Sequence, residues 1–360
     1  MVDLGTRVRR VAAAGVAVGA MITFPLAVGG RAAQGAAASG KLSHRFVKAA
    51  DGVYHAISTI GSLASNSQVI INDEDVVLVD THTTPRQAKL LLADIKTLTA
   101  KPIRTVVNTH FHFDHTHGNE VFAPTADIIG SEYARQTIVA GVLQNRTARS
   151  VIDPVAPRIE DMKKQLAAET DAAKKASLQD QIAVQEEYLA GLAEAHPTAP
   201  TKTLKDGERV TLKRANREIQ IISVGRAHTG GDLVVYLPTE RIVCTGDFLT
   251  SGTPYMTDSY PQQWADALEI LRKLDFETVL PGHGDLFTGK ANIDATQAYL
   301  RDVWKQAGDL KKKGVAVADA AKQIDMTPHS KEYPNIKAPG LAPLFVNRMY
   351  ELMEGKDQLR

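Results

Sequence analysis

Short apolar, β-branched runs alternate with longer helical patterns along most of the chain. Runs of this kind, when polar turns bound them, indicate strands that are at least half buried. Pro85 begins a predicted helix that extends to about residue 98, and Ser131 is placed to cap another. The strands predicted in the first half lie at residues 53–58, 67–71, 76–80, 103–108 and 126–130.

Residues 155–195 differ in character, because they are rich in Ala, Glu, Lys and Gln and carry apolar residues at mostly helical spacing. We therefore expect a helical hairpin over about 155–196, with Ser177 and Asp180 forming a capping box. Two roles stay open for this insertion. It is either a solvated helical segment without chemistry, or a lid or dimer arm beside the functional site.

Strand patterns resume at residue 202 and are again followed by helices. Because strands precede helices in both halves, the pattern predicts two sheets packed face to face, each covered by helices on its outer side. The strands predicted here begin at residue 202 and continue at 209–212, 218–224, 233–237, 241–244 and 278–280, and the helices lie at 262–274, 292–312, 315–324 and 341–353.

The N-terminal residues have the composition of an export signal. Arg7, Arg9 and Arg10 precede an uncharged stretch over residues 11–28, and the small residues 36–38 offer a cleavage site. We expect a signal peptide at residues 1–38 and a periplasmic or secreted protein without stable membrane association after cleavage. An uncleaved N-terminal anchor is the alternative. Residues 39–325 are then expected to form a catalytic domain, with residues 326–360 as a C-terminal helical extension of it.

Composition narrows the class of protein further. The 360 residues are 44% hydrophobic and 23% charged, which excludes a mainly disordered chain and a polytopic membrane protein. The 42 basic and 41 acidic residues give a net charge of +1, which argues against a nucleic-acid partner. Cys244 is the only cysteine, so an intrachain disulfide and a cysteine-rich zinc module are excluded.

The strongest chemical signal is a histidine-rich loop directly after the predicted strand 103–108. It reads His-Phe-His-Phe-Asp-His and offers His110, His112, Asp114 and His115 as donors. Alternating His110 and His112 can point to the same side of an extended segment. Since imidazole and carboxylate are the usual ligands of zinc outside cysteine-rich sites, this loop predicts a metal site.

Three later loops have the same form, each with one His or Asp at the end of a strand and next to glycine. They carry His228, Asp247 and His283. Glycine there permits a tight turn or a close approach of the backbone. Each loop alone is a weak signal, but the four loops in this order are specific.

This order of motifs resembles the metallo-β-lactamase superfamily over about residues 50–290. The resemblance implies an α+β fold, a four-layer αββα metallo-β-lactamase sandwich that here carries the helical-hairpin insertion. It assigns the first metal to His110, His112 and His228. It assigns the second metal to Asp114, His115 and His283, and Asp247 to both metals. It also assigns Asp80 the role of orienting a ligand histidine. The implied metal ligands are His110, His112, Asp114, His115, His228, Asp247 and His283.

Two positions indicate which branch of the superfamily this sequence resembles most. The best-known β-lactamases of this fold have Cys or Ser where Asp247 stands, and an Asp there resembles glyoxalase II and acyl-homoserine lactonases. Cys244 lies three residues earlier, and we interpret it as a core thiol. His112 argues against the iron-containing flavodiiron branch, which has Glu at that position.

The resemblance implies a dinuclear zinc hydrolase, and the N-terminal pattern adds the expectation that it is exported. A metal-bound hydroxide would attack the carbonyl of a small ester, lactone, thioester or amide, and Asp114 would act catalytically by taking its proton. Two Zn²⁺ are expected, with iron or manganese as alternatives. The partner is then a small-molecule substrate, and the oligomeric state stays open. The competing hypotheses are a β-lactamase that hydrolyses β-lactam antibiotics and a non-catalytic metal- or partner-binding protein.

The other notable residues are weighed against ordinary packing. Tyr255, Met256 and Tyr260 follow Asp247 closely and are candidates for substrate contact. Residues 61–66 join two predicted strands and are expected to form either a flap or a plain loop. The remaining histidines match no ligand position of the motif. His117 is expected beside the ligands or in solvent, His82 in the pocket or in a turn, and His44, His55, His196 and His329 in structural roles.

Overall fold

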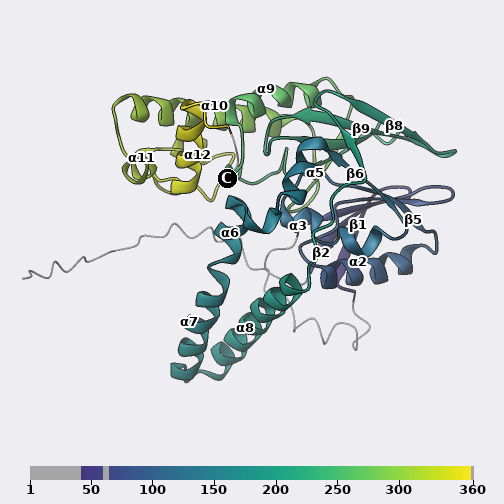
Figure 1. The fold of residues 1–360 in the computed structure, drawn as a ribbon, viewed down its shortest axis with the longest axis horizontal. Helices are drawn as coiled ribbons and strands as arrows, with labels where there is room; N and C mark the ends of the chain where they lie inside the picture. The colour runs from purple at the N-terminus through teal and green to yellow at the C-terminus, as the bar shows by residue number, and fades with distance from the viewer. Residues whose placement is uncertain (1–41, 60–64, 358–360) are drawn as a thin grey trace, which may run out of the picture.

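The structure is a computed structural model that describes residues 42–59 and 65–357 (Figure 1). The expected signal peptide and residues 61–64 of the expected flap lie outside the described residues. The strands are β1 (His44–Ala50), β2 (Val53–Ser58), β3 (Ser67–Ile71), β4 (Val76–Val79), β5 (Ile103–Val107), β6 (Asp127–Ser131), β7 (Lys202–Leu204), β8 (Arg209–Lys213), β9 (Glu218–Gly225), β10 (Asp232–Leu237), β11 (Ile242–Gly246), β12 (Thr278–Pro281) and β13 (Phe287–Thr288).

Helices connect these strands and cover them. The α-helices are α2 (Pro85–Leu98), α3 (Phe113–Thr116), α4 (Asn119–Phe122), α5 (Glu132–Val139), α6 (Arg146–Ile152), α7 (Val155–Ala168), α8 (Ala172–Ala193), α9 (Pro261–Arg272), α10 (Ala291–Lys312), α11 (Val317–Gln323) and α12 (Pro343–Met353). Among the residues that the structure describes, none of the helices is both long and apolar enough to cross a membrane.

The strands form two mixed sheets. One sheet has the order β1-β2-β3-β4-β5-β6-β7, and the other has the order β13-β12-β11-β10-β9-β8. Strands β4 to β7 run parallel to one another, β11 and β12 form a second parallel pair, and the remaining pairs are antiparallel. The carboxyl ends of β4, β5 and β6 therefore lie at one edge of the first sheet.

The two sheets pack face to face through alternating side chains. Val77 and Val79 of β4 meet Ile219 and Ile221 of β9 in one buried apolar cluster. Their neighbours Val76 and Leu78 point the other way and join a different cluster. This period of two is the signal by which the sequence predicts buried strands. Cys244 is buried in the cluster between the sheets, as expected for a core thiol.

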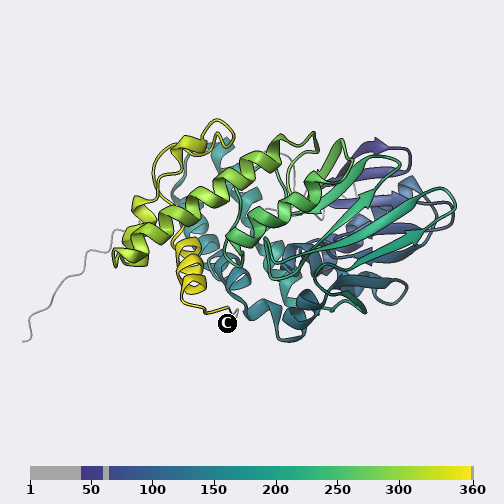
Figure 2. The same ribbon diagram turned by 90° about the horizontal axis from the view of Figure 1, so that it is seen from above.

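The outer faces are covered by helices, which completes four layers. Helices α2 and α4 contribute Leu91 and Phe122 to the cluster on the outer face of the first sheet. Helices α9, α10 and α12 contribute Trp264, Leu300 and Val346 to the cluster on the outer face of the second. Figure 2 shows α9 and α10 lying along that sheet. The expected αββα sandwich is the observed fold.

Helices α7 and α8 form the expected hairpin, which projects from the body below α6 (Figure 1). Its capping differs from the prediction. Helix α8 begins at Ala172 with Asp171 as its N-cap, and the Asp171 side chain accepts a hydrogen bond from the Lys174 amide at 2.9 Å. The proposed Ser177–Asp180 capping box is wrong, because Ser177 lies inside the helix. An aspartate at a helix start caps as well as a serine does, so the pattern alone did not separate them.

Candidate metal centre

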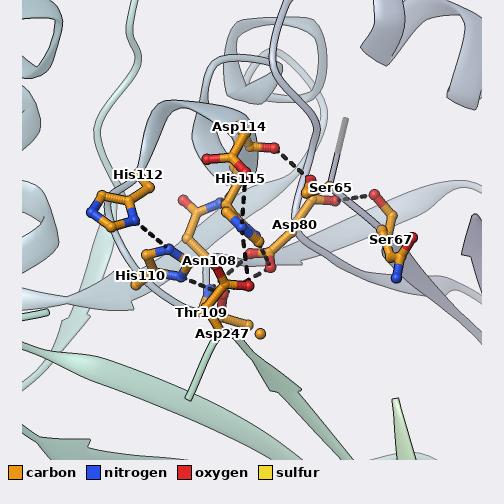
Figure 3. Close-up of polar contacts among 12 residues, drawn as sticks. Ser65, Ser67, Asp80, Asn108, Thr109, His110, His112, Asp114, His115 and Asp247 are labelled. Atoms are coloured by element: carbon orange, nitrogen blue, oxygen red, sulfur yellow. Dashed lines mark hydrogen bonds and ion pairs between the residues drawn. The ribbon is translucent and has the colours of Figure 1, made fainter. Parts of the chain in front are cut away.

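The four predicted loops meet at one edge of the sandwich. His110 follows β5, His228 follows β9, Asp247 follows β11 and His283 follows β12. Because each side chain comes directly after a strand's carboxyl end, the two sheets bring all four together. Figure 3 shows the histidines of the first loop converging with Asp247.

Three fully buried histidines form the inner part of the centre. His110 Nε2 lies 3.0 Å from His112 Nδ1, and His228 Nε2 lies 3.1 Å from that same nitrogen. These nitrogen–nitrogen distances are close to the value of about 3.3 Å that a tetrahedral zinc ion with Zn–N bonds of about 2.05 Å would require.

Two carboxylates and two histidines form the outer part. His283 Nε2 lies 3.1 Å from Asp114 Oδ2 and 3.4 Å from Asp247 Oδ2. His115 Nε2 lies 3.3 Å from Asp114 Oδ2 and 3.6 Å from Asp247 Oδ1. The other Asp247 oxygen lies 3.6 Å from His228 Nε2, so this carboxylate reaches toward both parts.

The residues present fit metal ions. Ligand atoms lie within 4.8 Å of one another in three groups, each with at least two histidines. His115 Nε2 and Asp247 Oδ1 are buried and have no hydrogen-bond partner among the described residues. Such atoms are unfavourable in a folded chain unless another group binds them, and a cation is the partner that both a ring nitrogen and a carboxylate oxygen accept. The groups are His110, His112 and His228; His110, His115 and Asp247; and Asp114, His115 and His283.

The outer part is the side that solvent reaches. The side chains of Asp114 and Asp247 are 15% and 13% exposed, and that of His283 is 31% exposed. By contrast, the residues His110, His112 and His228 are at most 3% exposed. A molecule in solvent would therefore reach the centre from the side of the carboxylates.

Burial and charge set different protonation states in the two parts. Burial lowers the pKa of His110 well below its usual value and that of His228 to about 3, so both rings are neutral at pH 7. A neutral imidazole is the form that binds a metal. Burial also opposes positive charge on His283, but the carboxylates of Asp247 and Asp114 raise the pKa of His283 to about 10. The outer part thus attracts positive charge.

Asp80 orients one of these histidines, as the resemblance implies. Its Oδ2 accepts from His115 Nδ1 at 2.8 Å, which leaves His115 Nε2 directed at the centre. Thr109 donates to Asp80 through both its amide and its hydroxyl, and the hydroxyl lies 3.0 Å from His110 Nδ1 (Figure 3). Asp80 has φ of +60°, a left-handed conformation that is unfavourable for a residue other than glycine and is tolerated here at the centre.

The structure adds a buried carboxylate that the sequence did not single out. Asp258 Oδ2 lies 3.1 Å from His112 Nε2, the ring nitrogen opposite to the one that faces the centre. Thr147 of α6 donates to the same oxygen. Asp258 is 146 residues from His112 in sequence and belongs to none of the metal motifs, so only the fold reveals it. It orients His112 as Asp80 orients His115.

Helix α12 holds the loop that carries Asp258. Arg348 is fully buried, and its Nε donates to the Ser259 carbonyl at 3.0 Å. Its guanidinium carbon lies 4.5 Å from the centre of the Tyr260 ring. Glu351, one turn later, pairs at 2.7 Å with Arg146, the residue before Thr147. The C-terminal helix is thereby linked to the metal centre by two routes.

Glycine and asparagine fix the loop that carries His283. A Cβ at Gly282 would lie 2.3 Å from Asp247 Oδ1 and 2.8 Å from His115 Cε1, so no larger residue fits. The Asn66 side chain donates to the Gly284 carbonyl at 2.8 Å, and the Asn66 amide donates to the Gly282 carbonyl at 2.7 Å. Asn66, at the end of the expected flap, therefore fixes the position of this loop through two hydrogen bonds.

The three residues expected to contact substrate lie in two kinds of position, one beside the centre and two in packed surroundings. Tyr255 lies beside the centre, with its ring centroid 6.3 Å from that of His112 and 6.4 Å from that of His228. Met256 is fully buried in the outer apolar cluster of the second sheet. Tyr260 is 1% exposed, and its ring packs between the Arg226 and Arg348 guanidinium groups. Met256 and Tyr260 thus occupy packing positions, unlike Tyr255.

Four of the histidines outside the ligand set are held by polar neighbours. His44 Nδ1 lies 2.8 Å from Asp94 Oδ2, and its Nε2 lies 2.9 Å from His82 Nε2. His55 Nε2 lies 3.1 Å from the Gly284 carbonyl oxygen. His329 Nε2 lies 2.9 Å from Asp302 Oδ2. These contacts agree with the structural roles expected for His44, His55 and His329, and they place His82 in a buried turn.

Comparison with known proteins finds one family and several distant relatives. A family model described as the metallo-beta-lactamase superfamily matches residues 60–283. The linear primary-alkylsulfatase of a Pseudomonas strain is 24% identical over 282 residues, which cover 72% of this chain and 50% of that protein. The type 2 metallo-beta-lactamase of Bacillus cereus is 29% identical over 109 residues, which cover 26% of this chain and 43% of that protein.

A solved structure is similar over a larger share of the chain. The inverting sec-alkylsulfatase Pisa1 of a Pseudomonas species has a TM-score of 0.61 and 15% identity, covering 86% of this chain and 50% of that chain. At this identity the likeness concerns the fold alone. The chain spans about half the length of the curated relatives it matches.

Proposed function

The chain belongs to the metallo-beta-lactamase superfamily, and on this basis we propose that it is a metal-dependent hydrolase with two metal ions at the centre described above. The observation that carries the proposal is the position of Asp247, whose Oδ1 lies 3.6 Å from His115 Nε2 and whose Oδ2 lies 3.4 Å from His283 Nε2 and 3.6 Å from His228 Nε2. A carboxylate in that position suits two cations better than one. Zinc is proposed because the donor set is imidazole and carboxylate, with iron or manganese as alternatives.

The proposed division of ligands follows the two parts of the centre. One ion would be held by His110, His112 and His228, and the other by Asp114, His115 and His283, with Asp247 between them. When bound, such a pair supplies an activated water and a Lewis acid at neutral pH.

The chain's own residues then do the following. Asp80 and Asp258 hold the rings of His115 and His112 in fixed orientation. Asp114, a partly exposed carboxylate at the centre, can receive the proton of the attacking water and pass it to the leaving group. The water oxygen joins the carbonyl carbon, the acyl bond breaks, and the products are an acid and an alcohol, thiol or amine.

We propose a small carbonyl substrate, namely an ester, lactone, thioester or amide. The Asp at position 247 supports this over a β-lactam, as the best-known β-lactamases of the fold differ there. The likeness to an alkylsulfatase over 72% of the chain favours a sulfate ester as a second candidate. A β-lactam is the third, supported by the shorter match to a β-lactamase.

A panel assay separates these candidates. The zinc-loaded full chain is given p-nitrophenyl acetate, γ-butyrolactone, p-nitrophenyl sulfate and a chromogenic cephalosporin, each with and without chelator. Chelator-sensitive turnover of the acetate or the lactone supports the proposal, and turnover of only the sulfate or the cephalosporin replaces it with that candidate. Zinc binding without turnover of any probe favours the non-catalytic alternative.

Export to the periplasm or the outside is also a proposal, and it rests on the basic and apolar pattern of residues 1–38. Cell fractionation followed by N-terminal sequencing of the purified protein tests it. A mature N-terminus near residue 39 in the exported fraction supports cleavage. An intact N-terminus in the membrane fraction supports the anchor instead.

A further inference from the structure

Helix α12 has two sides with different neighbours. On one side, the Lys311 ammonium of α10 lies 4.5 Å from the centre of the Tyr350 ring and pairs at 2.5 Å with Glu354, directly after α12. On the opposite side, the helix faces α6 and the loop before α9, which carries Asp258. Figure 1 shows α12 between α10 and α6. The helix therefore connects the outer layer of the second sheet with the surroundings of the metal centre.

Three residues of α12 make the contacts on the side that faces the centre. They are Phe345, Arg348 and Glu351. Because they are three positions apart, they are neighbours along one side of the helix. The Phe345 ring stands edge-on to the Tyr255 ring with centroids 5.1 Å apart, and the Tyr255 ring stands edge-on to that of His112 at 6.3 Å. The first contact of α12 thus reaches His112 through a single intervening ring.

The other two residues hold the segments on either side of the Asp258 carboxylate. Arg348 Nε donates to the backbone carbonyl directly after Asp258 at 3.0 Å, and a buried donor to a carbonyl fixes the course of the loop in a way that an apolar side chain does not. Glu351 pairs at 2.7 Å with Arg146, and the next residue, Thr147, donates to Asp258 Oδ2. Both contacts therefore fix the surroundings of this carboxylate.

All three contacts converge on the His112 ring. Asp258 Oδ2 lies 3.1 Å from His112 Nε2, and Tyr255 stands beside the same ring. His112 supplies the central nitrogen of the inner part, since the Nε2 atoms of His110 and His228 lie 3.0 and 3.1 Å from its Nδ1. A rotation of this ring would move that nitrogen away from the position the three rings share. Because metal affinity depends on ring orientation, a residue that fixes His112 also affects metal binding.

We propose that Glu351 and Arg348 are positioning residues for the inner metal ion, and that they hold the His112 ring in its ligand orientation through Thr147 and Asp258. The inference rests on the proposed function, because it concerns the ion that the three inner histidines would hold. It gives α12 a role in metal binding besides its packing on α10. By linkage, a bound ion then stabilises the docking of α12 in return.

A matched pair of variants separates this role from ordinary packing. Glu351→Gln and Glu354→Gln each remove the charge of a glutamate that pairs with a basic side chain, the first on the side of the centre and the second on the side of α10. The full chain and both variants are titrated with zinc in competition with a chromophoric chelator, and Tm is measured on the metal-free samples. We expect Glu351→Gln to bind zinc about 2- to 10-fold more weakly, an effect typical of substitutions along a coupled network. Glu354→Gln should lower Tm and leave zinc affinity unchanged.

A double substitution tests the route to the metal. In a chain that already carries Asp258→Asn, adding Glu351→Gln should weaken zinc binding by less than about 2-fold, because both changes act on the same contact. Arg348→Lys keeps the charge but replaces the planar group that lies over the Tyr260 ring, and it should behave as Glu351→Gln does. Equal zinc affinity in the parent and Glu351→Gln, equal weakening in Glu351→Gln and Glu354→Gln, or additive effects in the double variant overturns the inference.

The two proposals fail in different ways. A parent chain that binds zinc but hydrolyses no probe contradicts the proposed hydrolase, and the comparison of zinc affinities still decides the role of Glu351. A parent chain with chelator-sensitive turnover, whose zinc affinity is unaltered by Glu351→Gln, retains the proposed function and overturns the inference. A parent chain that binds no zinc contradicts both.

Discussion

Asp258 and His112 are 146 residues apart in the sequence, and their buried side chains meet at 3.1 Å through Oδ2 and Nε2. The contact joins the loop after β11 to the first metal motif. Because the carboxylate accepts the proton on His112 Nε2, it leaves Nδ1 free of a proton and directed at His110 and His228.

Replacing this carboxylate by its amide should weaken metal binding. Asp258→Asn keeps the size of the side chain but removes the charge that fixes the His112 ring, and we expect about 10- to 100-fold weaker zinc binding. Competition with a chromophoric chelator measures it. Asp266→Asn on the exposed face of α9 is the matched control, since the Asp266 side chain is 81% exposed and lies 3.8 Å from Arg301. Equal zinc affinity in both variants would contradict the role of Asp258.

Loss of His115 should affect the outer ion more than the inner one. His115 Nε2 lies 3.3 Å from Asp114 Oδ2, whereas the inner triad of His110, His112 and His228 does not include it. We expect His115→Ala to bind about one equivalent of zinc where the parent binds two, as measured by metal analysis after gel filtration. Retention of both ions, or loss of both, would show that the outer triad is wrongly assigned.

Removal of Asp247 should lower metal content and turnover together. Its Oδ2 lies 3.4 Å from His283 Nε2 and 3.6 Å from His228 Nε2, so the carboxylate lies between both parts of the centre. Loss of a residue that only hydrogen-bonds to a metal ligand lowers activity by up to about 100-fold. Because Asp247 is itself a proposed ligand, we expect Asp247→Ala to reduce turnover by at least about 100-fold. Rate and zinc content are measured on the same sample. A variant with both values unchanged would rule out a bridging role.

An ion pair at the opposite end of the sandwich should make stability depend on pH. Asp75, before β4, accepts two bonds from Arg214 Nε and one from Nη2, at 2.9, 3.0 and 2.7 Å. Burial alone would raise the pKa of Asp75, but Arg214 and Asn72 bring it below its usual value. The pair therefore stabilises the fold above the unfolded pKa of about 4 and loses this contribution as pH falls through the lower folded value.

The variant Asp75→Asn isolates that contribution. We expect it to destabilise the protein by about 1–2 kcal/mol between pH 5 and 8, since hydrogen bonds to a charged group are lost. The Tm difference between parent and variant should shrink below about pH 4. Thermal unfolding across this pH range measures it. A difference that grows toward acid pH would have the wrong sign and contradict the account.

The strands of the fold and the histidine motif after β5 are both recognisable from local patterns in the sequence. Val77 and Val79 alternate with Val76 and Leu78, so the two faces of β4 are visible as a period of two. His110 and His112 follow a strand within one short motif. Such features depend on neighbours in sequence, and for this reason the two packed sheets and the first histidine motif could be predicted from them, whereas the full set of seven donors came from the resemblance to a known family.

The residues that support the centre depend on contacts between distant segments. Asp258 lies in the loop before α9 and contacts His112 across the fold, and Arg348 holds the same loop from α12; neither residue has a spacing that marks it. The pairing of Glu351 with Arg146 emerges only when α12 packs beside α6. The capping error at Ser177 has a different origin, because Asp171 is an equally good cap and only the helix length decides between them.

The central claim is that two metal ions at this centre perform hydrolysis, and a zinc titration of the metal-free full chain tests it most directly. Bound zinc and turnover of p-nitrophenyl acetate are measured in the same samples as zinc is added. The account predicts saturation at about two equivalents and turnover that rises with zinc and is lost on adding chelator. Turnover that is already complete without metal, or a chain that binds no zinc, would contradict it.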